Sequence, residues 1–199
     1  GVLALVCDST NILRDGVSPS EAEVALALKE VIGAARNRVV VTTFASNVAR
    51  IRAVALAAKA AGRKVVLLGR AMERVVNVAR ENGFLDGVEP FLSGEAYGSL
   101  GREEIVVLAT GSQGEPRAAM ARIAIDDHPI AKLAAGDTVI FSSRTIPGNE
   151  REVGRIVNNL IGQGVEVVTD RTALVHASGH PRRGEVAKLY EWVQPKIVV

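Results

Sequence analysis

Arg38-Val-Val-Val-Thr42 decides the fold class, because a helical pattern over 46–61 and a second aliphatic run, Lys64-Val-Val-Leu-Leu68, follow it directly. Short aliphatic runs without alternation are typical of strands that are buried on both faces. A strand, a helix and another strand in this order indicate a parallel pair joined by a right-handed crossover. The same alternation continues along the chain, and it predicts strands at Val2–Cys7, Arg38–Thr42, Lys64–Leu68, Glu104–Ala109, Asp137–Phe141 and Val165–Val168, in a run that closes at Val175, and in one that begins at Lys196.

Helical patterns fill the spaces between these runs. Ser18 stands three residues before Glu21, which predicts a capping box at the start of the first helix. Gly62, Gly83 and Gly164 come just after helical patterns, where a left-handed residue often ends a helix. We therefore expect an α/β fold of three layers, a mostly parallel sheet with helices on both faces. The expected helices are Ser20–Ala35, Ser46–Ala61, Met72–Asn82, Ala118–Ala124, Glu150–Ile161 and Arg182–Trp192.

Composition narrows the class of protein. The 199 residues are 48% hydrophobic and 4% aromatic, which favours a core of Val, Ile, Leu and Ala. No apolar stretch approaches the roughly 20 residues of a transmembrane helix, so we expect no membrane partner. The single Cys7 excludes an internal disulfide and favours the reducing cytoplasm. The net charge of +2 does not by itself indicate a nucleic-acid partner, although 18 of the 24 basic residues are Arg, whose fork matches phosphate groups.

Polar loops follow most of the expected strands. Because the carboxyl ends of parallel strands lie at one edge of a sheet, these loops are candidates for a shared site. Their hydroxyls, amides, glycines and arginines suit a polyanionic ligand that carries sugars, although hydroxyl residues at helix starts are also ordinary caps. The loops are Asp8–Asn11, Thr43–Asn47, Thr110–Arg117, Ser142–Glu150 (with Arg144) and His176–His180.

Two of the loops indicate particular chemistry. Thr110–Glu115 holds two glycines among hydroxyl and amide residues before a helical pattern. Such a segment can present backbone N–H groups to a phosphate, or can simply be a glycine-rich tight turn. The G-x-x-x-x-G-K-[ST] phosphate loop and the G-x-G-x-x-G dinucleotide fingerprint are both absent. His180 lies in a small-residue turn that opens a helix, where an imidazole can transfer protons near neutral pH.

Asp8 is the most economical partner for His180. A carboxylate that accepts from one ring nitrogen fixes the tautomer, and the other nitrogen can then deliver a proton to a leaving oxygen. The alternative is that Asp8 caps a helix or forms a turn. His128, in Asp126-Asp-His-Pro129, is expected to be a solvated loop residue. Three histidines without an H-x-H-x-D-H cluster cannot assemble a closed metal site within this chain.

Five ordered motifs together resemble the bacterial ribonuclease J family. The motifs are Cys7-Asp-Ser-Thr-Asn11, Thr43-Phe-Ala-Ser-Asn47, Ala109-Thr-Gly-Ser-Gln-Gly-Glu115, Phe141-Ser-Ser-Arg-Thr-Ile-Pro-Gly-Asn-Glu150 and Val175-His-Ala-Ser-Gly-His180. The resemblance implies a Rossmann-like β-CASP domain at 18–170, with edge segments of a metallo-β-lactamase domain at 1–17 and 171–199. It covers essentially the whole chain.

The resemblance also implies roles for individual residues. His180 would be a general acid for the leaving 3′ oxygen, and Asp8 would orient it. His176, Ala177, Ser178 and Gly179 would line the pocket of a 5′-terminal phosphate. Ala45, Ser46 and Asn47 would lie against the RNA backbone, and we add Thr110, Gly111, Ser112, Gln113 and Arg144 as RNA-binding candidates.

The activity implied is that of a metal-dependent 5′-3′ exo- and endoribonuclease in rRNA maturation and mRNA decay. Two Zn²⁺ ions are implied for the intact enzyme, with ligands outside this chain, so we expect the isolated chain to bind RNA weakly and to cleave nothing. The implied partner is single-stranded RNA with a 5′-monophosphate, and the intact protein is expected to be a cytoplasmic homodimer or homotetramer.

Two other readings stay open from the residues alone. One is a Rossmann-like domain that binds a nucleotide or sugar phosphate at the strand-edge loops. The other is an assembly module, since the apolar helix face Val54–Ala61 could pack on a partner.

Overall fold

A computed structural model describes all residues, 1–199, as two compact units. The larger unit comprises Glu21–His176, and the smaller unit combines Gly1–Ser20 with Ala177–Val199. The domain boundaries expected from the resemblance, 1–17, 18–170 and 171–199, stay a prediction. None of the helices is long and apolar enough to cross a membrane.

The larger unit is built on a five-stranded parallel sheet of order β3-β4-β2-β5-β6. Val41 at the centre is aligned with Leu108 on one side and Ile140 on the other. All residues of the three central strands are buried, which explains why their sequences are aliphatic without alternation. The strands are β2 (Val39–Thr42), β3 (Lys64–Leu68), β4 (Ile105–Ala109), β5 (Thr138–Phe141) and β6 (Glu166–Val168).

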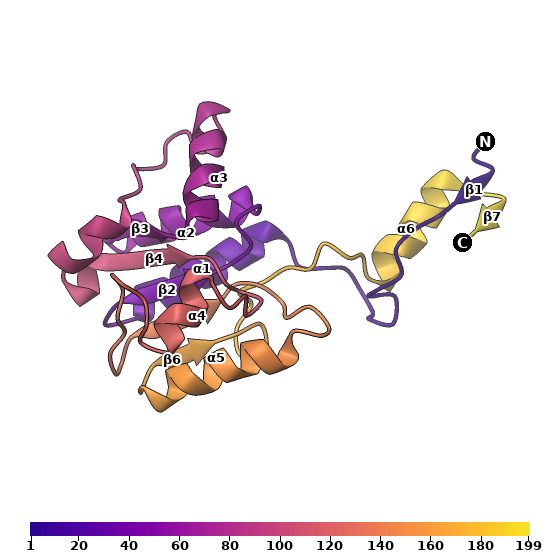
Figure 1. Ribbon diagram of the computed structural model, residues 1–199. Helices are drawn as coiled ribbons and strands as arrows, with labels where there is room; N and C mark the ends of the chain where they lie inside the picture. The colour runs from indigo at the N-terminus through magenta and orange to yellow at the C-terminus, as the bar shows by residue number, and fades with distance from the viewer. The chain divides into compact units, whose positions relative to one another are not determined.

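Helices cover both faces of this sheet, as Figure 1 shows, with α2 and α3 on one side and α4 and α5 on the other. Alternate strand residues such as Val40 and Val107 share a core with Met120 of α4 and Leu160 of α5. The predicted three-layer α/β class is therefore confirmed. The helices are α1 (Glu21–Ala34), α2 (Val48–Ala60), α3 (Arg70–Glu81), α4 (Ala119–Ala124) and α5 (Glu150–Gly162), with the 3-10 segments η1 (Gly94–Ser99) and η2 (Arg102–Glu104) before β4.

At β2, the connections that leave neighbouring strands run to opposite faces of the sheet. The chain leaves β2 through α2, on one face, whereas it leaves the neighbours β4 and β5 through α4 and α5, on the other face. Loops that separate in this way open a crevice at the carboxyl ends of the strands, which is where open α/β sheets bind ligands.

The smaller unit contains one helix and a short parallel ladder. β1 (Ala4–Leu5) pairs with β7 (Ile197–Val198), and α6 spans Arg183–Val193. β1 is shorter than the predicted Val2–Cys7 because β7, its one partner, supplies only two paired residues. Val186 is the one apolar residue of this unit that is fully buried.

Two sequence predictions of local structure are wrong. The run that ends at Val175 is not a strand: it follows a turn, and the Val175 carbonyl accepts from side chains instead of a ladder partner. The capping box between Ser18 and Glu21 does not form, because the Ser18 hydroxyl donates to Glu185 while Glu21 pairs with Arg50. In both cases a polar contact distant in sequence replaces the local one.

Candidate functional site

Arg50 organises the carboxyl edge of the sheet in the larger unit, and no sequence motif indicated it. Its side chain is fully buried in α2 and donates from Nε (3.0 Å) and Nη2 (2.7 Å) to the two carboxylate oxygens of Glu21. Its Nη1 donates to the carbonyl and hydroxyl of Ser142 (2.9 and 2.6 Å) and to the carbonyl of Val175 (2.8 Å). The Ser142 hydroxyl in turn donates to the Val175 carbonyl at 2.6 Å. One guanidinium thus fixes the end of β5 and the backbone that leads into His176.

Gln113 joins the loops after β4 and β5. Its side-chain Nε2 donates to the Arg144 carbonyl at 2.9 Å, and its Oε1 accepts from the Ile146 N–H at 2.8 Å. The residue is buried, and both ends of its amide are engaged within the protein. Its geometry is that of a clamp between two loops.

The glycine-containing turn after β4 is closely packed. Gly111 has a φ of +110°, and an added Cβ would lie 2.9 Å from the Cβ of Ala118. Ser112 is buried, and the Thr110 hydroxyl oxygen lies 3.5 Å from the Ala119 N–H, which donates to it. The turn is therefore tight, and of its hydroxyl residues only Thr110 is partly exposed.

The loop after β2 presents small residues at the start of α2. Asn47 is the N-cap, since its Oδ1 accepts from the Arg50 N–H at 3.0 Å. Ala45 is half-buried and Ser46 is exposed. The structure thus gives Asn47 a local task and leaves the Ser46 hydroxyl open to solvent.

His176 ends the larger unit as a neutral imidazole. Burial lowers its pKa below the usual value, and the positive charge of Arg50 lowers it further. Its Nδ1 is buried without a hydrogen-bond partner. Arg144 is half-buried and adds a smaller electrostatic effect in the same direction.

Asp8 and His180 meet in the smaller unit. The Asp8 carboxylate and the Nδ1 of His180 form a direct hydrogen bond, although the residues are far apart in sequence. The Thr10 hydroxyl and the Thr10 N–H, which lies 2.8 Å from Oδ1, together with His180, hold the pKa of Asp8 at about 2. Asp8 is thus ionised near neutral pH and accepts the hydrogen bond from Nδ1–H of His180. The Nε2 of His180 is left as the ring nitrogen that can exchange a proton with a ligand. The His180 side chain is 55% exposed.

Ser178 and Asn11 hold the turn that carries His180. The Nδ2 of Asn11 donates to the Ser178 hydroxyl (3.0 Å) and to the His180 carbonyl (3.1 Å). The His180 N–H also donates to the Ser178 hydroxyl, at 3.2 Å. Ala177 is half-buried and Gly179 is exposed beside it. Asn11 is buried and was not among the predicted site residues, although it belongs to the motif that contains Asp8.

Glu185 closes the start of α6. Its carboxylate accepts from the Arg182 N–H at 2.8 Å and from the N–H and hydroxyl of Ser18 at 2.9 and 2.7 Å. These hydrogen bonds lower the pKa of Glu185. The turn from Ser178 to Arg182 is thereby fixed at both ends.

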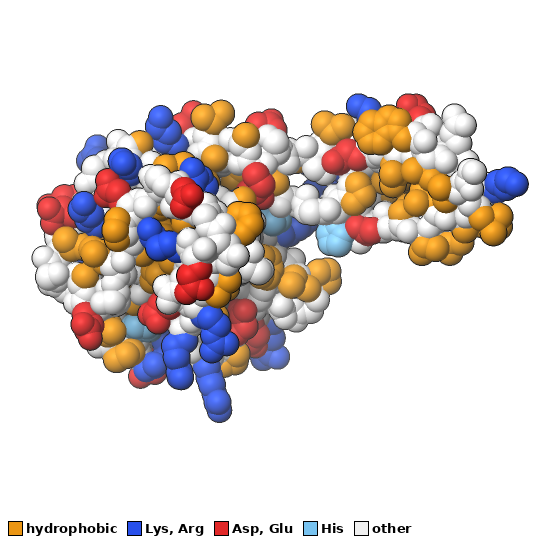
Figure 2. Space-filling view, turned by 90° about the horizontal axis from the view of Figure 1, so that it is seen from above, with side chains coloured by type: hydrophobic (Ala, Val, Ile, Leu, Met, Phe, Trp, Pro, Cys, Tyr) orange, Lys and Arg blue, Asp and Glu red, His pale blue; other side chains and the backbone are white.

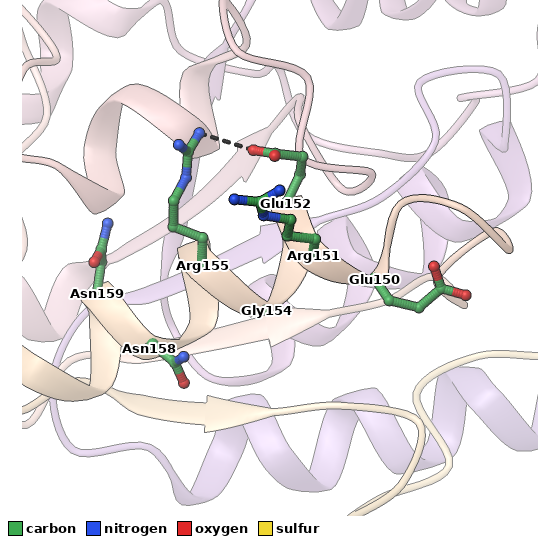
Figure 3. Close-up of a pocket in the computed structure, with 7 residues that line it drawn as sticks. All are labelled: Glu150, Arg151, Glu152, Gly154, Arg155, Asn158 and Asn159. Atoms are coloured by element: carbon green, nitrogen blue, oxygen red, sulfur yellow. Dashed lines mark ion pairs between the residues drawn. The ribbon is translucent and has the colours of Figure 1, made fainter.

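No metal cluster accompanies these groups, and the face of the larger unit seen in Figure 2 carries side chains of both charges. No three His, Cys, Asp or Glu side chains are arranged to hold a metal ion. In Figure 2, basic and acidic side chains are interspersed over the larger unit, with one group of basic side chains projecting from its lower edge, while apolar side chains gather on the smaller unit. An open depression on α5, shown in Figure 3, is lined by mixed charges, and Arg155 pairs there with Glu152 at 2.8 Å.

Comparison with known proteins identifies the family. Residues 36–160 match the family described as "Ribonuclease J, beta-CASP domain". The chain is 58% identical over its full length to the ribonuclease J of Sinorhizobium meliloti and covers 35% of that protein. It is 42% identical over 98% of its length to the ribonuclease J of Thermus thermophilus, covering 34%, and 36% identical over its full length to the ribonuclease J2 of Bacillus subtilis, covering 36%. The chain thus spans about a third of the length of these relatives. The resemblance predicted from the five motifs is confirmed: the chain belongs to the ribonuclease J β-CASP family.

Proposed function

We propose that this chain is the RNA-binding β-CASP part of a bacterial ribonuclease, in which His180 is the general acid and Asp8 orients it. The observation that carries the proposal is the hydrogen bond between the Asp8 carboxylate and the Nδ1 of His180. Asp8 fixes the ring orientation, and Nε2 is left to donate its proton to the 3′ oxygen that leaves when the phosphodiester is hydrolysed.

The phosphate-binding side of the proposal uses the turn before α6. The hydroxyl of Ser178 and the exposed backbone of Gly179 stand beside His180, and these groups are the proposed contacts of the phosphate. The first N–H groups of α6 are already used, because Arg182 donates to Glu185 and the next two residues donate to the Arg14 and Gly16 carbonyls. His176, Ala177 and the loop at Ala45–Asn47 complete the proposed RNA-binding set, together with Thr110, Gly111, Ser112 and Arg144. Gln113 acts in this proposal as the clamp that positions the Arg144 loop.

Two Zn²⁺ ions and a metallo-β-lactamase domain stay predictions from the resemblance. The residues of this chain do not fit a zinc site, and we route no step through a metal ion. The exposed apolar side chains of the smaller unit, such as Leu3, Val6 and Trp192, support packing against a further domain in the longer protein. A cytoplasmic location and a homodimer or homotetramer belong to the same proposal, as does action on rRNA and mRNA.

A binding experiment tests the proposal on the 199-residue chain. Short single-stranded RNAs with a 5′-monophosphate or a 5′-hydroxyl are titrated at low salt. We expect tighter binding of the phosphorylated RNA and loss of this preference in Ser178→Ala and in His180→Ala. Arg151→Ala is the matched control, because this arginine is exposed on α5 and outside the proposed site.

Equal and purely salt-dependent binding of the two RNAs would contradict the 5′-phosphate site, because generic attraction to phosphates does not distinguish the ends. Steady RNA hydrolysis by the pure chain with added Zn²⁺ would contradict the expectation that the isolated chain cleaves nothing.

A further inference from the structure

A cavity of about 720 Å³ opens at the carboxyl ends of β3 and β4. Only Thr110 is shared between its lining and the residues proposed above to bind RNA. The volume lies in the range of pockets that hold small organic ligands, about 300–1,000 Å³. The cavity therefore has the size of a ligand site and has no function in the mechanism described so far.

Three arginines from three different segments line this cavity. Arg70 is the first residue of α3, Arg117 lies in the connection from β4 to α4, and Arg122 belongs to α4. Arg70 and Arg117 are exposed and make no ion pair or hydrogen bond through their side chains. Arg122 is oriented by Asp127, whose carboxylate lies 3.4 Å from its Nε and whose carbonyl lies 2.7 Å from its Nη2. The guanidinium groups of Arg70 and Arg117, which line one cavity and have no partner in the chain, suit a phosphate group, which arginine can bind in a bidentate way.

His128 adds a neutral donor to the same cavity. Its Nδ1 accepts from the N–H groups of Ile130 (3.3 Å) and Ala131 (3.1 Å), so the ring proton is assigned to Nε2. Burial lowers the pKa of His128, and the charge of Arg122 lowers it further. The sequence expectation of a loop residue is confirmed, but the ring is half-buried rather than fully solvated, because it accepts hydrogen bonds within its own loop and lines the cavity.

The backbone between β3 and α3 approaches the cavity closely. Gly69 has a φ of +115°, and a Cβ there would lie 2.4 Å from the Thr110 hydroxyl oxygen. The tight turn places the first residues of α3 in the lining, and no side chain caps this helix. Its N–H groups add to the attraction for a phosphate, which the arginines already provide.

The rest of the lining indicates more than a simple anion. Glu73 and Glu95 bring two carboxylates, which repel free phosphate but accept hydrogen bonds from sugar hydroxyls. Leu68, Pro129 and Ile130 supply an apolar surface. A nucleotide has groups that match each part of this lining: a phosphate for the arginines, sugar hydroxyls for the carboxylates and a base for the apolar side chains.

We propose that this cavity binds a nucleoside monophosphate, with Arg70 and Arg117 on the phosphate and Arg122 and His128 beside them. The nucleotide can be free or can be one residue of an RNA strand, since both have the same chemistry. The inference goes beyond the proposed function, because it assigns no role to Asp8, His176 or His180.

Calorimetric titration of the 199-residue chain with adenosine 5′-monophosphate tests this proposal, with ribose 5-phosphate, adenosine and inorganic phosphate as separate arms. We expect saturable binding of the nucleotide and weaker binding in each other arm. Arg70→Ala and Arg117→Ala should each weaken it roughly 10-fold or more, as expected for a hydrogen bond between charged groups. Both residues are exposed, so neither variant should unfold the chain, and Arg151→Ala again serves as the control of equal charge.

A 5′-hydroxyl RNA added to the titration identifies the source of the ligand. If the RNA competes with the nucleotide, the cavity binds one residue of an RNA strand, and if it does not compete, the cavity binds a free nucleotide. Either result supports the cavity site. The proposal is overturned if the nucleotide does not bind, if Arg151→Ala weakens binding as much as Arg70→Ala, or if ribose 5-phosphate or phosphate binds equally well. The preference for 5′-phosphorylated RNA depends on Ser178 and His180 and is scored separately, so either proposal can fail alone.

Discussion

At the residue scale, Asp8 and Arg50 each pair with a charged or titratable side chain that is distant in sequence. Asp8 is ionised with a pKa of about 2 and holds the Nδ1 of His180. Arg50 is fully buried and is held by the Glu21 carboxylate. The first contact concerns chemistry and the second concerns the position of the loops, so their substitution should have different consequences.

Substitution of His180 should affect turnover much more than RNA affinity. In a full-length ribonuclease J that carries this chain, we expect His180→Ala to lower kcat by ~10²–10⁴-fold, the range for a general acid. The Kd for RNA should change far less, and only through the lost preference for a 5′-phosphate. Single-turnover kinetics and binding titrations measure the two quantities. Arg151→Ala, at an exposed position outside both proposed sites, is the control, and an unchanged kcat in His180→Ala would remove the residue from its proposed role.

Substitution of Arg50 should destabilise the larger unit. Arg50→Met removes one of the two buried donors of each carbonyl, so that Val175 keeps only the Ser142 hydroxyl and Ser142 keeps only the Thr43 hydroxyl. The substitution also leaves Glu21 without its ion-pair partner. We expect a loss of about 3 kcal/mol in the free energy of unfolding, at the low end for breaking a buried ion pair because Glu21 is partly exposed. Urea unfolding measures this, and Arg36→Met, at an exposed arginine, should change it by less than about 0.5 kcal/mol. Equal losses of stability in Arg50→Met and Arg36→Met would refute the proposed stabilising role of Arg50.

At the element scale, tight turns and side-chain caps decide where helices begin. α3 starts directly after Gly69, in a conformation that only glycine adopts without strain. α6 starts at a carboxylate that accepts three hydrogen bonds, from Arg182 and Ser18. Each start leads to a separate prediction.

Substitutions at Gly69 and Thr110, which meet in the turn before α3, should have non-additive effects on the free energy of unfolding. Gly69→Ala places a Cβ against the Thr110 side chain at a φ of +115° and should cost roughly 1–3 kcal/mol for backbone strain alone. Thr110→Ala removes the closest atoms of that clash, so the double variant should be more stable than the sum of the single changes predicts. Urea unfolding of the four proteins gives the coupling energy, and strict additivity would show that the clash is relieved elsewhere.

The smaller unit should lose stability at acidic pH. The pKa values of Asp8 and Glu185 are both lowered in the folded protein, so their contributions are complete above the usual values of 3.8 and 4.5. The contributions disappear as the pH falls below these values, for Asp8 toward about 2. Hydrogen exchange of α6 amides between pH 5 and about 2.5 measures the loss, and Glu185→Gln should flatten the profile. A wild-type profile as flat as that of the variant would contradict this linkage.

At the scale of the whole molecule, the two units differ in how much core they contain. The larger unit buries all residues of its three central strands, whereas Val186 is the one fully buried apolar residue of the smaller unit. Local opening is easiest where few apolar contacts are buried. The smaller unit also exposes large apolar side chains, which include Val6 and Trp192.

Hydrogen exchange should therefore separate the units. We expect amides of β2 and β4 to exchange at least ~100-fold more slowly than those of β1 and α6, since about 2.7 kcal/mol of extra protection corresponds to that factor. Mass spectrometry of peptic peptides measures both sets in one sample. Equal protection would mean that the smaller unit opens only with global unfolding.

Local sequence patterns predicted the regular elements well, because the burial of an element leaves its periodicity in the local sequence. The run Lys64–Leu68 is aliphatic because both faces of the strand are buried, and the predicted bounds are those of β3. The helices begin and end within two residues of their predicted bounds. The failures, at Val175 and at Ser18, occur where a distant side chain supplies the hydrogen bond that a local partner was expected to supply.

The sequence by itself determined the α/β class, the family and the two residues that form the candidate acid pair, since periodicity and ordered motifs are properties of the chain. Only the tertiary structure decided that Asp8 meets His180, that Arg50 holds Ser142 and Val175, and that Arg70, Arg117 and His128 line one cavity. The physical reason is that side chains separated by tens of residues are brought together by strand order and crossovers, and a linear pattern does not contain those distances.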